Sequence, residues 1–336
     1  MPNHPDHVSR RTFLKTTSAC AAHMALMATP FPAAARTLWS RRSLKPIVAQ
    51  EPFGRLEEVG GGIFAFISTP LTGDYTTVSN GGIIAGRNGV LVVEAFQTPE
   101  GSRWIAEKAR ELTGRWPTHV LITHYHGDHS GGVEGYFQDT PTAAAPGGGG
   151  PGVMATLTTR DMVAERIPDD APDTIRRRWA DVVLVDLEEP STLDLGGRQV
   201  FLTPRKGHTP SDVTAALPDE EMVWCGDLVW NGMFPNYMDA IPSVLSRSVR
   251  ALQADKQILY VPGHGPLANG EDMARYLSVI DGLEETARTA RREGWTAEEA
   301  GNRHRIPESL GEWTLFNPAY FQRAVEAWMT EWERGG

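Results

Sequence analysis

The stretch from Thr123 to Gly132, THYHGDHSGG, places three imidazoles and a carboxylate within six positions. On an extended segment side chains alternate, so His124 and His126 would point to the same side and could bind one metal ion. Asp128 and His129 follow where the glycines allow a tight turn, and they could face a second ion about 3.5–4 Å away, the spacing of two-metal sites. The stretch therefore predicts two incomplete metal sites that need further ligands.

Three later positions could supply these ligands, and each follows a run that is typical of a β-strand. His208 lies in Gly-His-Thr-Pro after VFLTP, Asp227 lies in Gly-Asp after MVWC, and His264 lies in Pro-Gly-His-Gly after ILYV. Open α/β sheets place their sites at such strand ends. We expect these three side chains to complete the two metal sites.

The positioning elements are predicted to be short strands followed by C-terminal helices. A helix is predicted at Glu100–Leu112 and strands at Ile63–Ser68, Gly82–Ala85, Val90–Phe96, His119–Thr123, Val182–Asp186, Gln199–Thr203, Val213–Leu217, Met222–Cys225 and Ile258–Val261. From about residue 270 apolar residues recur at helical spacing, and Asn317 and Pro318 are predicted to begin a last helix.

Composition limits the classes of function. The chain has 336 residues, 40% of them hydrophobic, and a formal net charge of −10. This apolar content is enough for one large domain or two modest ones. The negative charge argues against nucleic acid as a partner, because phosphate binding uses clustered Lys and Arg. A small-molecule substrate is expected, and the sequence does not indicate the oligomeric state.

Residues 1–35 are predicted to be a twin-arginine signal peptide rather than part of the fold. Arg10 and Arg11 precede a weakly apolar run over Thr16–Thr29, and Ala33–Ala35 has the small residues of a cleavage site. The run is too short and too broken for a stable membrane span. The prediction implies passage through the twin-arginine export machinery of a bacterium to a periplasmic or secreted location. The mature domain would be 36–336, with a formal charge of −12.

Three further features are predicted with alternatives left open. Cys20 would leave with the leader, so that Cys225 could form no intramolecular disulfide in the mature chain; it is expected to be a core residue, with metal ligation as the alternative. Ala143–Gly152, AAAPGGGGPG, reads as a flexible connection or a mobile flap beside the site. Leu228–Tyr237 brings three aromatic residues near the metals, where they would line an apolar substrate pocket or simply pack: Trp230, Phe234 and Tyr237.

The order HxHxDH, GHTP, GD and PGHG resembles the metallo-β-lactamase superfamily over about residues 60–264. The resemblance implies an α/β fold, an αββα sandwich with its site at one edge, here with C-terminal helices added over about 270–336. It also implies two zinc ions per chain, with Fe or Mn as alternatives, and a bridging carboxylate as in the glyoxalase II-like and lactonase-like branches. The implied ligands are His124, His126 and His208 for the first ion, Asp128, His129 and His264 for the second, and Asp227 between them.

This ligand set predicts hydrolysis. Two cations sharing a water lower its pKa enough to provide hydroxide near neutral pH. Asp128 would be the catalytic residue that orients the nucleophile and passes on its proton, and the bond cleaved would be an ester, thioester, lactone or amide. Three alternatives remain: a persulfide dioxygenase-like enzyme with one iron on His124, His208 and Asp227; a β-lactamase; and a binding module without turnover.

Overall fold

The computed structural model describes residues 45–138, 150–186, 189–255, 257 and 259–335. The predicted leader lies outside these residues, and so does most of the glycine-rich segment, of which residues 150–152 are described. A strand begins there at Gly152. None of the helices in the described ranges combines the length and apolarity needed to cross a lipid bilayer.

One sheet contains eight strands that lie side by side in chain order. Strands β1 to β5 pair antiparallel, whereas β5 to β8 pair parallel and are joined through helices. The bounds are β1 Ile47–Glu51, β2 Gly54–Gly60, β3 Ile63–Ser68, β4 Gly81–Ala85, β5 Val90–Val93, α3 Pro99–Thr113, β6 His119–Leu121, α4 Gly127–Ser130, β7 Gly152–Thr156, α5 Leu157–Ala164, α6 Asp173–Ala180 and β8 Val183–Val185.

The other sheet has five strands in the order β13-β12-β11-β10-β9. Its bounds are β9 Ser191–Asp194, β10 Gln199–Arg205, β11 Asp212–Leu217, β12 Met222–Trp230 and β13 Leu259–His264. The last two strands run parallel, joined by a crossover that contains α7 (Pro242–Ala254). Parallel strands end at the same edge of a sheet, so Asp227 and His264 are brought to one edge.

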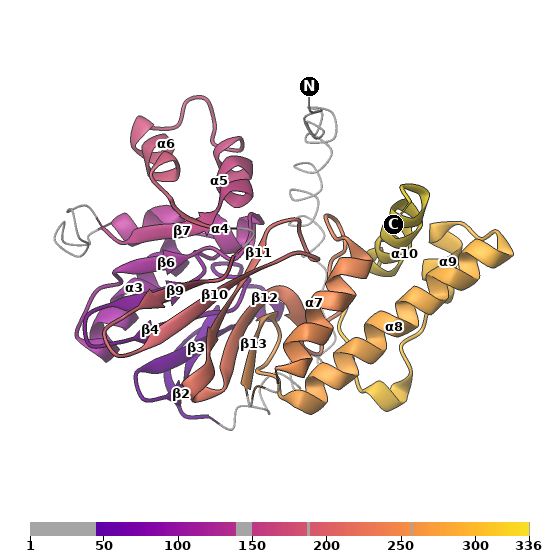
Figure 1. The fold of residues 1–336 in the computed structure, drawn as a ribbon, viewed down its shortest axis with the longest axis horizontal. Helices are drawn as coiled ribbons and strands as arrows, with labels where there is room; N and C mark the ends of the chain where they lie inside the picture. The colour runs from indigo at the N-terminus through magenta and orange to yellow at the C-terminus, as the bar shows by residue number, and fades with distance from the viewer. Residues whose placement is uncertain (1–44, 139–149, 187–188, 256, 258, 336) are drawn as a thin grey trace.

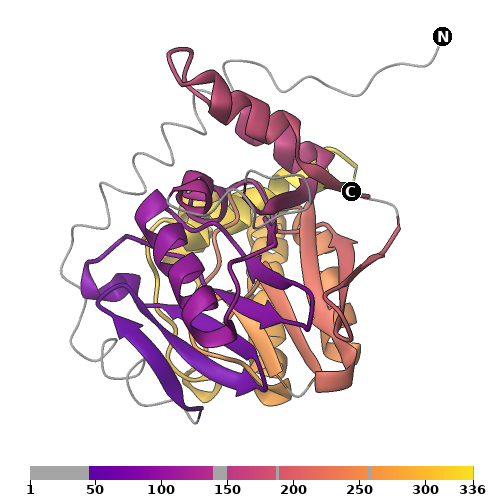
Figure 2. The ribbon, with the colours of Figure 1, turned by 90° about the vertical axis from the view of Figure 1, so that its left-hand side faces the viewer.

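The two sheets face each other across an apolar core that includes Leu91, Trp224 and Val261. Helix α3 packs its Ile105 and Ala109 on the outer face of the eight-stranded sheet. On the outer face of the five-stranded sheet lie α7, α8 (Gly270–Glu293), α9 (Ala297–Arg303) and α10 (Tyr320–Glu333). Figures 1 and 2 show this layering. The αββα sandwich with added C-terminal helices is therefore confirmed.

Several boundaries differ from those predicted. Strand β12 continues five residues beyond Cys225, to Trp230, because its apolar run is buried throughout. Helix α10 begins at Tyr320 instead of directly after Asn317, whose side-chain oxygen accepts a hydrogen bond from the Ala319 N–H in a preceding turn. Strands β1, β2, β7 and β9 and helices α4 to α7 and α9 were not predicted.

Candidate metal centre

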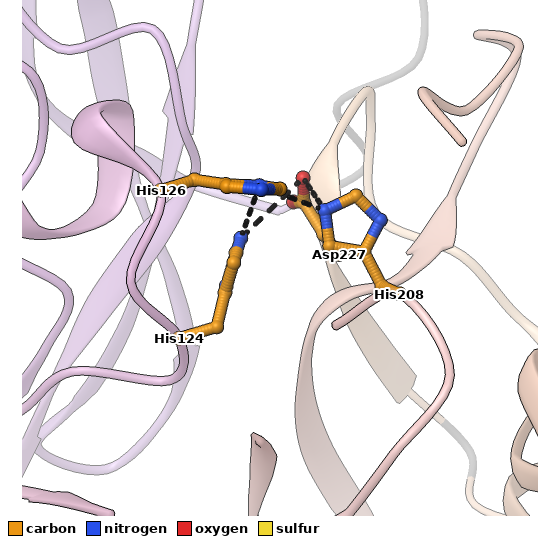
Figure 3. Close-up of side chains that lie close together, drawn as sticks. All are labelled: His124, His126, His208 and Asp227. Carbon is orange, nitrogen blue, oxygen red and sulfur yellow. Dashed lines mark hydrogen bonds and ion pairs between the residues drawn. The ribbon is translucent and has the colours of Figure 1, made fainter. Parts of the chain in front are cut away.

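Seven side chains converge where the two sheets meet at one edge, and they are the seven that the motifs singled out. The loop after β6 carries two of them and the short helix α4 that follows carries two more, while the β10–β11 turn, β12 and the end of β13 each carry one. Figure 3 shows His124 and His126 approaching from one side and His208 and Asp227 from the other. The centre therefore lies between the two halves of the sandwich.

The first cluster consists of His124, His126 and His208 with Asp227, all buried. The Nδ1 atom of His126 lies 3.1 Å from Nε2 of His124 and 3.0 Å from Nε2 of His208. Oδ2 of Asp227 lies 3.2 Å from Nε2 of His208 and 3.9 Å from Nε2 of His124. Four potential ligand atoms thus face one point.

The second cluster consists of Asp128, His129 and His264. Oδ2 of Asp128 lies 3.6 Å from Nε2 of His129 and 3.3 Å from Nε2 of His264. The other oxygen of Asp227, Oδ1, lies 3.1 Å from Nε2 of His129 and 3.4 Å from Nε2 of His264. One carboxylate therefore presents one oxygen to each cluster.

These distances fit metal ions. A tetrahedral zinc ion with bonds of about 2.0–2.1 Å holds its ligand atoms about 3.3 Å apart, close to the separations in both clusters. The Nδ1 atom of His126 cannot form good hydrogen bonds to two imidazole nitrogens at once, because it is either one donor or one acceptor. A cation between the three rings would satisfy all their lone pairs. Ligation by these residues stays a prediction that the geometry favours.

The histidines of the two clusters differ in their pKa values. Burial lowers the pKa of His208 to about 3 and places that of His124 well below its ordinary value, so both rings are neutral. Burial also opposes protonation of His264, but Asp227 and Asp128 outweigh it and raise its pKa to about 9. The pKa of His129 is also raised well above its ordinary value, because Asp227 and Glu94 outweigh the effect of burial. Metal binding at the second cluster would therefore displace protons.

Glu94, which the sequence did not indicate, contacts His129 of the second cluster directly and is linked to His124 of the first cluster through Thr123. Its Oε1 lies 2.9 Å from Nδ1 of His129, and it also accepts the hydroxyl hydrogen of Thr123. The Thr123 hydroxyl oxygen lies 3.0 Å from Nδ1 of His124. Because this hydroxyl donates its hydrogen to Glu94, its oxygen can accept a hydrogen bond from the Nδ1–H of His124. The Glu94 backbone has φ of 78°, a left-handed conformation that costs free energy in a residue with a side chain. Such partners fix ring orientation at metal sites.

Replacement of Glu94 by Gln should weaken zinc binding about 10–100-fold, because the neutral amide holds the two imidazoles less firmly. Chelator competition on purified protein measures this affinity. Glu57→Gln is the matched control, since Glu57 is equally buried but pairs with Arg55 in β2, which supplies no ligand. An unchanged zinc affinity in the Glu94 variant would contradict this role.

Asn80 and Asp239 also support the ligands without a sequence signal. The Asn80 side chain donates to the carbonyl oxygens of Pro262 and Gly265 at 2.9 and 2.7 Å, which holds the loop that carries His264. Oδ2 of Asp239 lies 3.0 Å from Nε2 of His126, so it can accept the hydrogen on the nitrogen opposite the cluster. This contact leaves the Nδ1 lone pair of His126 for a metal.

The turn that carries His208 is held by Asp212. Its carboxylate accepts hydrogen bonds from the backbone N–H groups of His208 and Thr209 and from the Thr209 hydroxyl. Ser211 lies 3.1 Å, hydroxyl to hydroxyl, from Thr159 of α5. Ser211 and Asp212, which follow Gly-His-Thr-Pro, thus hold the turn that carries His208 in place.

Burial of the three aromatic residues favours the packing alternative over a substrate pocket, and Cys225 is also buried. Trp230, Phe234 and Tyr237 are only 1–2% exposed and belong to the core under the C-terminal helices, so they do not line an open pocket. Trp230 instead packs on the His264 ring at 4.0 Å between centroids. Cys225 is buried in the same core and lies outside the ligand clusters formed by the described residues.

Comparison with known proteins gives related sequences. The model of the metallo-β-lactamase superfamily matches residues 74–264. The hydroxyacylglutathione hydrolase of Parasynechococcus marenigrum is 24% identical over 155 residues, which are 44% of this chain and 50% of that protein. The metallo-β-lactamase type 2 of Bacillus cereus is 25% identical over 197 residues, 57% of this chain and 68% of that protein. The match spans only about half the length of the first relative.

Solved structures share the fold. A metallo-β-lactamase from Erythrobacter litoralis superposes with a TM-score of 0.55 at 17% identity, covering 70% of this chain and 99% of that one. A metallo-β-lactamase from Pontibacter korlensis gives a TM-score of 0.54 at 20% identity, covering 68% and 99%. Nearly the whole of each neighbour is therefore matched by about two thirds of this chain.

Proposed function

The chain belongs to the metallo-β-lactamase superfamily, and we propose that it is an exported, zinc-dependent hydrolase acting on an ester, thioester, lactone or amide-type bond of a small molecule. The observation that carries the proposal is the shared carboxylate of Asp227, with one oxygen toward each cluster. A dinuclear hydrolytic site needs such a pair of adjacent, complete ligand sets.

When bound, two zinc ions would supply Lewis acidity and a nucleophilic water at neutral pH. Asp128 is placed to accept a proton from that water, because 23% of its side chain is exposed whereas Asp227 is buried. Burial raises the pKa of Asp128, but His129 and His264 outweigh this and hold it below its usual value. The group is therefore a carboxylate at neutral pH and can accept a proton, orient the water and return the proton to the leaving group.

The substrate class is proposed from the names of the relatives and from the chemistry of the site. One relative is a hydroxyacylglutathione hydrolase and another a metallo-β-lactamase, so acyl bonds of two kinds fall within the related sequences. Export rests on the twin arginines and small-residue site of residues 1–35 alone. β-Lactam cleavage remains one member of the proposed bond classes.

The mononuclear iron alternative would use His124, His208 and Asp227. These three lie together, but His126 faces the same point and a second cluster shares Asp227. The structure thus offers more ligands than a single iron requires. This surplus favours the dinuclear hydrolase.

The test is elemental analysis of the full-length chain purified without added metal, followed by assays of an aryl ester, an acyl thioester, a lactone and nitrocefin. We expect about two zinc ions per chain and turnover of at least one class. Chelation should abolish this turnover and added zinc should restore it. One iron with little zinc would point to sulfur oxidation, and two zinc ions without turnover would point to a binding module; both would overturn the proposed function.

A further inference from the structure

A helical hairpin, α5 and α6, connects two parallel strands beside the metal centre. Figures 1 and 2 show it projecting beyond the sheets. Two arginines attach it to the body of the protein. Arg178 of α6 forms a two-point ion pair with Glu134 at 2.7 and 2.8 Å, and its guanidinium lies 3.5 Å from the Phe137 ring centroid. The other, Arg166, follows α5.

Arg166 contacts the ligand loop itself. Its Nη1 donates to the carbonyl oxygen of Tyr125 at 2.7 Å, and the guanidinium lies 5.2 Å from the Tyr125 ring centroid. Tyr125 stands between His124 and His126 in the chain, is 3% exposed, and places its ring 5.3 Å from that of His126. A charged side chain of the hairpin is thus fixed against the backbone between two predicted ligands.

Asp239 contacts the His126 ring on the nitrogen opposite the cluster, with its Oδ2 3.0 Å from Nε2. Tyr125, which Arg166 holds, and Asp239 therefore both contact the His126 ring.

We propose that the α5–α6 hairpin positions the first cluster: Arg166 holds the Tyr125 backbone while Asp239 holds Nε2 of His126, and together they fix the orientation in which His126 presents Nδ1 to a metal ion. Arg166 is a positioning residue and touches no reacting atom. Its hydrogen bond to the Tyr125 carbonyl oxygen holds the loop between His124 and His126. The inference rests on the metal centre proposed above, and it assigns a function to a segment that none of the sequence motifs includes.

The test compares Arg166→Gln with Arg178→Gln in the full-length chain. Both changes remove an arginine that anchors the hairpin, but only Arg166 contacts the ligand loop. Zinc affinity by chelator competition should fall about 10-fold in the Arg166 variant, as expected for loss of an outer partner, and stay unchanged in the Arg178 variant. The visible absorption of the Co²⁺-loaded protein should shift only in the Arg166 variant, because it reports ligand geometry.

A double-mutant cycle tests whether the two contacts act together. In an Asp239→Asn background, Arg166→Gln should cause a smaller loss of zinc affinity than in the wild type, because both contacts fix the same His126 ring. Arg166→Lys, which keeps the charge, should weaken zinc binding less and serves in the same cycle if the Gln variant does not fold. Equal effects of the two hairpin arginines, or full additivity with Asp239→Asn, would overturn the inference. Absence of metal from the wild-type protein would instead overturn the proposed function.

Discussion

Asp227→Ala is expected to lower zinc content from about two ions to one or fewer per chain and to reduce kcat/KM by more than the roughly 10–100-fold that loss of an outer partner costs. The reason is the geometry of one side chain. Its Oδ2 lies 3.2 Å from His208 and its Oδ1 lies 3.1 Å from His129, so a single change removes a ligand from both clusters. Elemental analysis and turnover on the same preparations measure both effects.

Two further variants give this prediction its controls. Asp227→Asn keeps the volume but lacks the charge and one acceptor oxygen, so it should also lose zinc. Asp194→Ala removes an exposed carboxylate that accepts N–H groups in the β9–β10 turn and should leave zinc content unchanged. Two tightly held zinc ions and normal turnover in the Asp227→Ala protein would disprove the bridging role.

Gly263→Ala should cause the second large effect although it removes no predicted ligand. A Cβ atom on residue 263 would lie 1.9 Å from Oδ1 of Asp227 and 2.8 Å from the Gly226 carbonyl carbon. Either the carboxylate moves out of place or β12 and β13 separate, and overpacking of this kind costs about 1–3 kcal/mol. Zinc affinity and the free energy of unfolding should both fall, as measured by chelator competition and by denaturant titration.

Gly282→Ala is the matched control for the same chemical change. Residue 282 lies within α8 on the exposed side, and a Cβ atom there would meet nothing within 4 Å. Alanine should raise the free energy of unfolding by up to about 1 kcal/mol, because glycine is a poor helix former, and leave zinc affinity unaltered. If both variants behave alike, close packing at Gly263 does not hold Asp227 in place.

The sequence singled out the candidate ligands that the structure brings together because their positions follow a local rule. Each of His208, Asp227 and His264 comes at or beside the end of an apolar run, and strand ends at one edge meet whatever lies between them in the chain. The sandwich could be predicted through the resemblance that these motifs carry. Neither step required knowledge of side-chain contacts.

The supporting residues could not be predicted, because their roles arise only in three dimensions. Glu94 lies in a left-handed backbone conformation that residues with a side chain rarely adopt, and no spacing relates it to His129. Asn80 stands in Ser-Asn-Gly-Gly, which is typical of a turn, yet it holds a loop far along the chain. Asp239 comes two residues after the aromatic stretch that was predicted to line the pocket.

The aromatic stretch was predicted either to line a pocket or to pack, and its burial favours packing for a physical reason. β12 was expected to stop at Cys225, which would have left Trp230 in a loop near the metals. The strand continues to Trp230, and the C-terminal helices cover it together with Phe234 and Tyr237. Large aromatic side chains gain more from such burial than from exposure at a site, and the distant helices that provide it were not visible in the local pattern.

The candidate ligands come from both halves of the sandwich, so a bound metal ion would link the two halves. The half of the chain before β7 brings His124, His126, Asp128 and His129, while the later half brings His208, Asp227 and His264. Neither half alone holds a full coordination sphere, so ions that bind only the closed arrangement add their binding free energy to the joint between the halves. Bound metal would therefore stabilise mainly the contact between the two halves. A chain in which the two halves are not yet packed together would bind metal only weakly.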